Sequence, residues 1–159
     1  MIAKELYPFM QVYAVIIGLV VGSFLNVIIY RLPNNKSIIK PRSKCNGCGK
    51  QIAWYDNIPV LSYIALLAKC RNCKSLISIR YPLVEFICGM MALMLLNIYG
   101  PSYEFLVVVL LCFMLIAITF IDVDHFVIPN EFIIFGFIIS ILSHTCLLYT
   151  SDAADERHG

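Results

Sequence analysis

Four cysteines are the residues of this chain whose spacing most directly indicates chemistry. They form two CxxC pairs, Cys45 with Cys48 and Cys70 with Cys73, and 21 residues (49–69) separate the pairs. A two-residue spacer lets both thiolates of a pair reach one metal ion from a single tight turn, and four thiolates are a common ligand set of structural zinc. The pattern predicts a structural Zn²⁺ site whose ligands are these four cysteines.

The cysteines also admit a different interpretation. Two independent CxxC pairs could form disulfides and exchange them with other thiols, which would make the chain a membrane thiol–disulfide protein. Cys88 and Cys112 lie within apolar stretches, and we expect them to be buried as small hydrophobic residues rather than to bind metal. Gly47 and Gly49 are predicted to supply the positive φ angles that such tight turns need.

A single carboxylate, Asp122, is the second candidate for chemistry. It ends an apolar stretch, so we expect it at the boundary of a membrane. Ionisable residues at membrane depth are costly and tend to mark functional sites, although an interfacial aspartate solvated by headgroups fits the position equally well. Asp124 lies two residues further on and faces another side of a continuing helix, so a catalytic pair of these two carboxylates is not expected.

The composition is that of a membrane protein that crosses the bilayer several times. Hydrophobic residues make up 60% of the 159 residues and charged residues only 14%, whereas soluble domains are about one-quarter charged. About 20 apolar residues are needed to span the hydrocarbon core. We therefore predict an all-α polytopic protein with about four transmembrane helices, at residues 9–30, 83–99, 105–121 and 132–145, of which the last is short for a crossing.

The distribution of basic residues predicts the orientation in the membrane. Ten of the 12 Lys and Arg residues lie between Arg31 and Arg80, and loops rich in Lys and Arg stay in the cytoplasm. The cysteine-containing loop is thus predicted to be cytoplasmic and zinc-ribbon-like, with the N-terminus outside. The expected organisation is a first helix (1–30), this loop (31–82), a membrane bundle (83–145) and a tail (146–159).

The tail has an unusual composition. Residues 146–156 resemble the in-frame translation of a transposase-end sequencing adapter. We therefore interpret residues 146–159 as an adapter-derived segment, exclude them from functional reasoning, and expect the natural chain to be longer.

Several motifs together resemble the bacterial type IV prepilin peptidases, a family of membrane aspartic proteases that are also N-methyltransferases. The resemblance covers residues of about 14 to 135 and depends on the order of the motifs rather than on any one of them. The motifs are residues 22–33 (GSFLNVIIYRLP), the two CxxC pairs, residues 54–63 (WYDNIPVLSY), residues 80–85 (RYPLVE), and residues 121–124 (IDVD) with 128–130 (IPN).

This resemblance implies an enzyme of the bacterial inner membrane. Such enzymes cleave the leader peptide of prepilins and pseudopilins at the cytoplasmic face, and many methylate the new N-terminus with S-adenosylmethionine. Asp122 matches the first of the family's two catalytic aspartates, and the second lies in a downstream Gly-x-Gly-Asp motif. That motif does not occur in this sequence, so we expect a C-terminally truncated chain that does not cleave. Prepilins and the lipid bilayer are the expected partners, with no nucleic acid.

Three further residues are candidates for contacting substrate or supporting the site: Asn26, Glu85 and Asp124. Asn26 shares a helix face with Gly22, and this face either packs against another helix through small residues or contacts substrate or methyl donor. Glu85 either belongs to a site or pairs with Arg80. The alternative to an enzyme is a non-catalytic membrane assembly protein that docks a partner through its zinc-ribbon loop.

Overall fold

A computed structural model of the chain describes residues 5–155, with only the backbone described for residue 142 and residues 144–155. No extended strand occurs among the described residues, which confirms the all-α prediction. The elements in chain order are α1 (Tyr7–Arg31), a 3-10 turn η1 (Trp54–Asn57), α2 (Leu61–Ala65), α3 (Arg80–Tyr99), α4 (Tyr103–His125) and α5 (Asn130–Asp155).

Three of these helices, α1, α3 and α4, are long and apolar enough to cross a membrane. Within the searched residues, the apolar part of α5 is shorter and covers Asn130–Ile141. Large apolar side chains on the outer face of α1, including Phe9, Ile16 and Val20, are more than half exposed. Such a surface would be unfavourable in water, but it is the expected surface of a helix that faces lipid.

Local sequence signals fix where the helices begin and end. Pro8 lies in the first turn of α1, where the missing amide hydrogen costs nothing. Gly100 ends α3 with a φ of 63°, a conformation that glycine adopts without steric cost. The Ser102 hydroxyl then caps α4 by accepting a hydrogen bond of 3.1 Å from the amide of Phe105. These residues account for the tight turn between α3 and α4.

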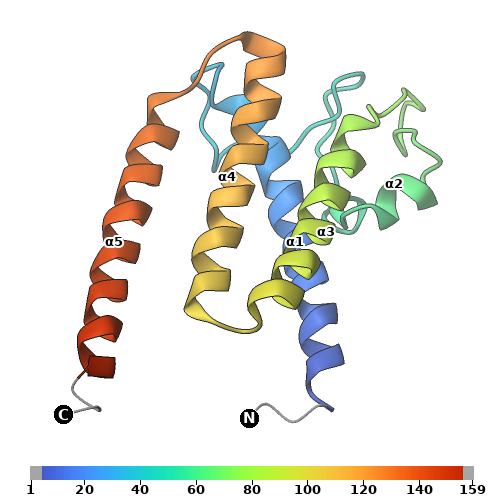
Figure 1. Cartoon of the computed structure of the whole chain (residues 1–159). Helices are drawn as coiled ribbons and strands as arrows, with labels where there is room; N and C mark the ends of the chain where they lie inside the picture. The colour runs from blue at the N-terminus through green and yellow to red at the C-terminus, as the bar shows by residue number, and fades with distance from the viewer. Residues whose placement is uncertain (1–4, 156–159) are drawn as a thin grey trace.

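The helices alternate in direction, so the connections gather at the two ends of the bundle. Figure 1 shows the start of α1 and the α3–α4 turn at one end. The long loop between α1 and α3 and the α4–α5 connection lie at the other end (Figure 1). The cysteine loop and the end of α4 that carries Asp122 are therefore at the same end of the bundle.

The closest helix pair is α1 with α3, and it packs through small residues. A Cβ atom on Gly22 would lie only 2.7 Å from the Cα atom of Glu85, and one on Gly18 would lie 2.8 Å from the Cα atom of Gly89. Slightly further along α1, the Asn26 side-chain amide donates a 3.0 Å hydrogen bond to the carbonyl of Tyr81. This arrangement supports the packing interpretation of the Gly22–Asn26 face.

The apolar core lies where α1, α3 and α4 meet. Its most deeply buried side chains come from all three helices: Ile29, Val84, Cys88, Ala117 and Ile121. The prediction that Cys88 is a buried hydrophobic residue is thereby confirmed, whereas Cys112 is only half-buried. Ile121 anchors the end of α4 in this core immediately before Asp122.

The expected adapter-derived segment, residues 146–159, stays a prediction. The backbone of α5 continues through it to Asp155, and residues 156–159 lie outside the described residues.

Substituting Gly22→Ala should force α1 and α3 apart, because the added methyl group would collide with backbone atoms of α3. We expect a loss of about 1–3 kcal/mol in the free energy of unfolding, typical of overpacking, even though alanine favours helix. Denaturant unfolding in detergent micelles measures it. Gly136→Ala is the matched control, because its Cβ would meet only the flexible Met114 side chain, at 3.2 Å. Equal stabilities of the two variants would contradict the close packing.

Candidate metal centre and membrane-end site

The two CxxC segments fold into the same knuckle, 25 residues apart. In the first, the amide of Cys45 donates to the carbonyl of Lys50 (2.9 Å), and in the second the amide of Cys70 donates to the carbonyl of Ser75 (2.8 Å). The same offset relates the isolated bridges that close the knuckles, Lys44 with Gln51 and Lys69 with Leu76. The two CxxC segments therefore form a repeated backbone structure.

Glycine has two different roles in the first knuckle. Gly49 has a φ of 70°, as predicted, and the equivalent position of the second knuckle is Lys74, with a φ of 61°. The prediction that Gly47 also has a positive φ is wrong. Gly47 is needed for space instead, because a Cβ atom there would lie 2.8 Å from the Ser75 hydroxyl oxygen.

The knuckles bring the four cysteine sulfur atoms together in a cluster that can hold a metal ion. All four Sγ atoms lie within 4.8 Å of one another, and those of Cys45 and Cys73, from different knuckles, are 3.7 Å apart. Tetrahedral coordination with metal–sulfur bonds of about 2.3 Å places neighbouring sulfur atoms about 3.8 Å apart. The cysteines therefore fit a tetrahedral tetrathiolate site that takes ligands from both knuckles.

Hydrogen bonds prepare part of this cluster for metal binding. The Ser75 hydroxyl and, after it, the backbone amides of Cys48 and Gly47 lower the pKa of Cys45 to about 6. The Ser75 hydroxyl also lowers the pKa of Cys73. Because a metal ion binds the thiolate, a thiol that is already ionised at neutral pH binds it without first losing a proton.

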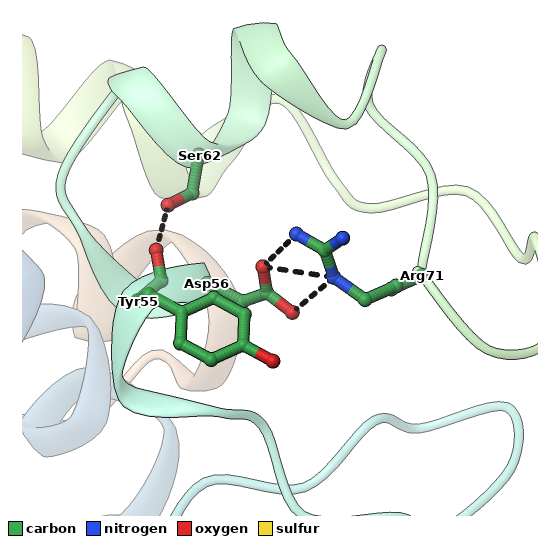
Figure 2. Close-up of polar contacts among 4 residues, drawn as sticks. All are labelled: Tyr55, Asp56, Ser62 and Arg71. Carbon is green, nitrogen blue, oxygen red and sulfur yellow. Dashed lines mark hydrogen bonds and ion pairs between the residues drawn. The ribbon is translucent and has the colours of Figure 1, made fainter.

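An ion pair fastens the second knuckle to the 3-10 turn η1. Figure 2 shows the guanidinium of Arg71, which lies between the second pair of cysteines, facing the carboxylate of Asp56. The Arg71 Nη2 atom lies 2.6 Å from Asp56 Oδ1, and Nε lies 2.9 Å from Oδ2. Arg71 lowers the pKa of Asp56 through this contact, and its guanidinium also lies over the ring of Tyr55 at 5.4 Å. Such a two-point contact sets the orientation of both partners.

The other side of η1 is fastened to α2 and then to α3. The Ser62 hydroxyl donates a 2.8 Å hydrogen bond to the carbonyl of Tyr55 (Figure 2). Just before α2, the amide of Val60 donates a 2.7 Å hydrogen bond to the carboxylate of Glu85 in α3. A continuous set of contacts thus connects the cysteine cluster to a buried carboxylate of the helix bundle.

The structure separates the two expected uses of Glu85. Glu85 is buried and accepts a hydrogen bond from Val60. Arg80 pairs with Asp124 instead, so the alternative of an ion pair between Glu85 and Arg80 is wrong. Five residues of α-helix turn a side chain well past the i+4 position, which places Glu85 on a different face from Arg80. Glu85 instead lines a cavity of about 720 Å³ together with Asn26 and Cys45.

Arg80 holds the end of α4 that carries Asp122. Its guanidinium forms an ion pair with Asp124 and lies 5.5 Å from the ring centre of Phe120. Asp124 is thereby turned toward α3, and Asp122 is exposed at the end of the bundle. The expectation that these two carboxylates do not form a pair agrees with this arrangement.

Sequence reasoning missed Asp56, Arg71, Ser75 and Val60 as parts of the site. Asp56 and Val60 lie in one motif, residues 54–63, and Arg71 lies inside a CxxC pair. These positions were a usable signal for Asp56 and Arg71, since an acidic and a basic residue in neighbouring motifs of one loop are natural partners. The contact of the Val60 amide has no such signal.

Comparison with known proteins gives a consistent result. Residues 16–99 match the sequence model of the family described as "Bacterial Peptidase A24 N-terminal domain". The chain is 44% identical over 134 residues to a prepilin leader peptidase/N-methyltransferase of Myxococcus xanthus, covering 84% of this chain and 40% of the relative. It is 36% identical to proteins of the same name from Pseudomonas putida, covering 81% of this chain, and Neisseria gonorrhoeae, covering 79%.

The chain spans about half the length of these relatives, namely 40% of the first and 52% of the other two. No solved structure matches it.

Replacing one cysteine of the cluster, Cys48→Ser, should abolish stable metal binding, because a tetrahedral site would keep only three thiolates. We expect purified wild-type protein to carry about one zinc per chain and the variant far less, measured by elemental analysis. Cys112→Ser, which removes a half-buried thiol in α4, is the control and should keep the metal. Reversible disulfides and no metal in the wild type would instead support the thiol–disulfide interpretation.

Metal retention should depend on Ser75 when the pH is lowered. The pKa of Cys45 is lowered to about 6 chiefly by the Ser75 hydroxyl, so Ser75→Ala should raise it. Protons then compete with the metal at a higher pH, and the pH of half-release should increase, which a zinc-indicator titration measures. Ser43→Ala is the matched control, because the second knuckle carries Ala68 at the equivalent position. The same half-release pH in wild type and Ser75→Ala would refute this role.

Proposed function

This chain belongs to the bacterial peptidase A24 N-terminal domain family, and on that premise we propose that it takes part in the processing of type IV prepilins or pseudopilins. The reactions are removal of the leader peptide at the cytoplasmic face of the inner membrane and methylation of the new N-terminus. The single observation that carries the proposal is that the cysteine loop and the C-terminal end of α4, which carries Asp122, lie at the same end of an apolar helix bundle (Figure 1).

The position of Asp122 suits a carboxylate that acts on a membrane-embedded substrate. Its neighbour Ile121 is buried in the core, while Asp122 is exposed where α4 ends. A substrate with a basic leader and an apolar helix would present the junction between them at this depth. In aspartic chemistry one ionised carboxylate activates water, and a protonated partner carboxyl polarises the scissile carbonyl.

Asp122 supplies one of those two carboxylates. Asp124 is held by Arg80 and faces α3, so it is not the partner. The 159 residues contain no Gly-x-Gly-Asp, the motif that carries the second aspartate in this family. We therefore propose that this chain alone does not cleave and that cleavage requires a second carboxylate from outside these residues.

The cysteine cluster has a structural role in this proposal, and zinc is the metal we assign to it. Four thiolates fill all four positions of a tetrahedral ion and leave none for a substrate. Among residues 32–79, all of which the structure describes, Cys70 is the only buried one. A loop with so little apolar burial needs the metal to hold its shape.

We assign the cysteine loop a role in the methylation reaction. We also place this loop on the cytoplasmic side of the membrane. S-adenosylmethionine, when bound, would supply a methyl group to the deprotonated substrate amine, with cleavage of the S–CH3 bond and release of S-adenosylhomocysteine. Ten of the chain's 12 Lys and Arg residues lie between Arg31 and Arg80, which favours a cytoplasmic loop. The N-terminus of α1 is then outside.

The cleavage part of the proposal is tested with two proteins. The 159-residue chain, incubated with a prepilin in detergent, should leave the leader attached, as seen by mass spectrometry. In a chimera of this chain with the remaining sequence of the Myxococcus xanthus relative, Asp122→Asn should slow leader removal by about 10²-fold or more, the usual contribution of a positioned acid or base. Glu104→Gln, an exposed change at the opposite end of α4, is the control.

Specific cleavage by the 159-residue chain would overturn the requirement for a second carboxylate. A zinc-loaded chimera that does not cleave at all would favour the non-catalytic docking function instead.

A further inference from the structure

The cavity beside Glu85 has the dimensions of a small-molecule site. Its volume is about 720 Å³, within the range of about 300–1,000 Å³ found for ligand sites in proteins. Its walls come from both knuckles, from η1, and from the ends of α1 and α3. The cavity is therefore completed only when the metal-bound loop is folded against the helix pair.

Glu85 is a buried carboxylate in this cavity without a cationic partner. Its side chain accepts the amide hydrogen of Val60 at 2.7 Å, and Ser23 lines the cavity together with it. The described residues form two ion pairs, Arg71 with Asp56 and Arg80 with Asp124, and neither involves Glu85. A carboxylate has about four acceptor sites, so Glu85 keeps capacity for a ligand.

The backbone is strained at the point where it contacts this carboxylate. Val60 has a φ of 58° and a ψ of −47°, a conformation that is rarely adopted by a β-branched residue. Such outliers are energetically costly and cluster at ligand sites. The strain directs the Val60 amide at Glu85 and so fixes the orientation of the carboxylate inside the cavity.

Other groups around the cavity suit a ligand that carries a positive centre, an aromatic ring and a carboxylate. Tyr63 and Tyr81 line it and offer aromatic faces, which attract cations and stack on heterocycles. Lys44 and Lys50 line it too and offer positive charge to a carboxylate. An adenosyl sulfonium methyl donor has all three features.

We propose that this cavity binds the sulfonium methyl donor and that Glu85 is the counter-charge of its sulfonium group. The assignment rests on the proposed methylation function, and it names the place and the residue through which the donor is recognised. Glu85 acts by binding: it stabilises the cationic donor and has no such interaction with the neutral thioether that remains after transfer. The site thus favours the donor over its spent product.

The test compares two ligands that differ in this charge. The zinc-loaded 159-residue chain in detergent is titrated with S-adenosylmethionine, a sulfonium, and with S-adenosylhomocysteine, a neutral thioether, by calorimetry. We expect the wild type to bind the sulfonium about tenfold more tightly or better, since one buried charge pair readily supplies that factor. Glu85→Gln, which keeps the shape and can still accept from Val60, should remove the preference. Glu131→Gln, an exposed change at the start of α5, should preserve it.

Each outcome decides the assignment. Equal wild-type affinities for the two ligands, or a preference that persists in Glu85→Gln, overturns it. If Glu85→Gln loses its zinc and so its fold, the wild-type comparison still decides whether a sulfonium is preferred. A second variant, Ser23→Ala, removes a polar group from the cavity wall and should lower the preference for the sulfonium without metal loss.

Transfer of the methyl group to a peptide amine, measured in the same samples, tests the proposed function separately. Preferential binding of the sulfonium without transfer would remove the methylation function from this chain and leave the binding site. Methyl transfer by the wild type, together with an unchanged preference for the sulfonium in Glu85→Gln, would support the methylation function and overturn the role of Glu85.

Discussion

The structure depends above all on the close approach of α1 and α3. Gly18 and Gly22 let the two backbones meet without intervening side chains, and the Asn26 amide then joins the helices at their loop end. This contact fixes the two ends of the long loop, because α1 leads into it and α3 leads out of it. In a bilayer, association of helices relies on such packing and on interhelical hydrogen bonds, since lipid tails are as apolar as the side chains. The position of Glu85, directly beside Gly22, is a result of the same contact.

The loop itself is held by directional contacts rather than by a core. Cys70 is its only buried residue, and its contacts are the sulfur cluster, the Asp56–Arg71 ion pair and the bond from Val60 to Glu85. An exposed ion pair of this kind contributes little free energy by itself, but its two-point geometry restricts how the knuckle can rotate. Specificity of the loop structure thus comes from geometry, and a metal ion held by the four cysteines would add stability that so little burial does not supply.

The helices and the sulfur cluster could be predicted from the sequence, whereas the contacts between distant residues could not. Long apolar runs predicted the helices α1, α3 and α4, because a bilayer requires a minimum length of apolar residues. The sulfur cluster was predictable because each chelating pair is local. The contacts of Glu85 and Arg80 were not: they join residues 25 and 44 positions apart, and their pairing depends on how α3 is rotated against its neighbours. The positive φ of Val60 could not be predicted either, because valine is not a residue type that indicates a positive φ.

The shared end of the bundle has a consequence for a substrate that passes from one reaction to the next. The long loop lines the cavity beside Glu85, and this loop lies at the same end of the bundle as the C-terminal end of α4, which carries Asp122 (Figure 1). In the proposed function, a pilin-like substrate would remain anchored by its apolar helix after removal of the leader, so its new terminus would move only within a thin layer next to the bilayer. Confinement of this kind replaces a search through the whole solution with a high effective concentration. Two sites of modest affinity can then act in succession on one tethered chain.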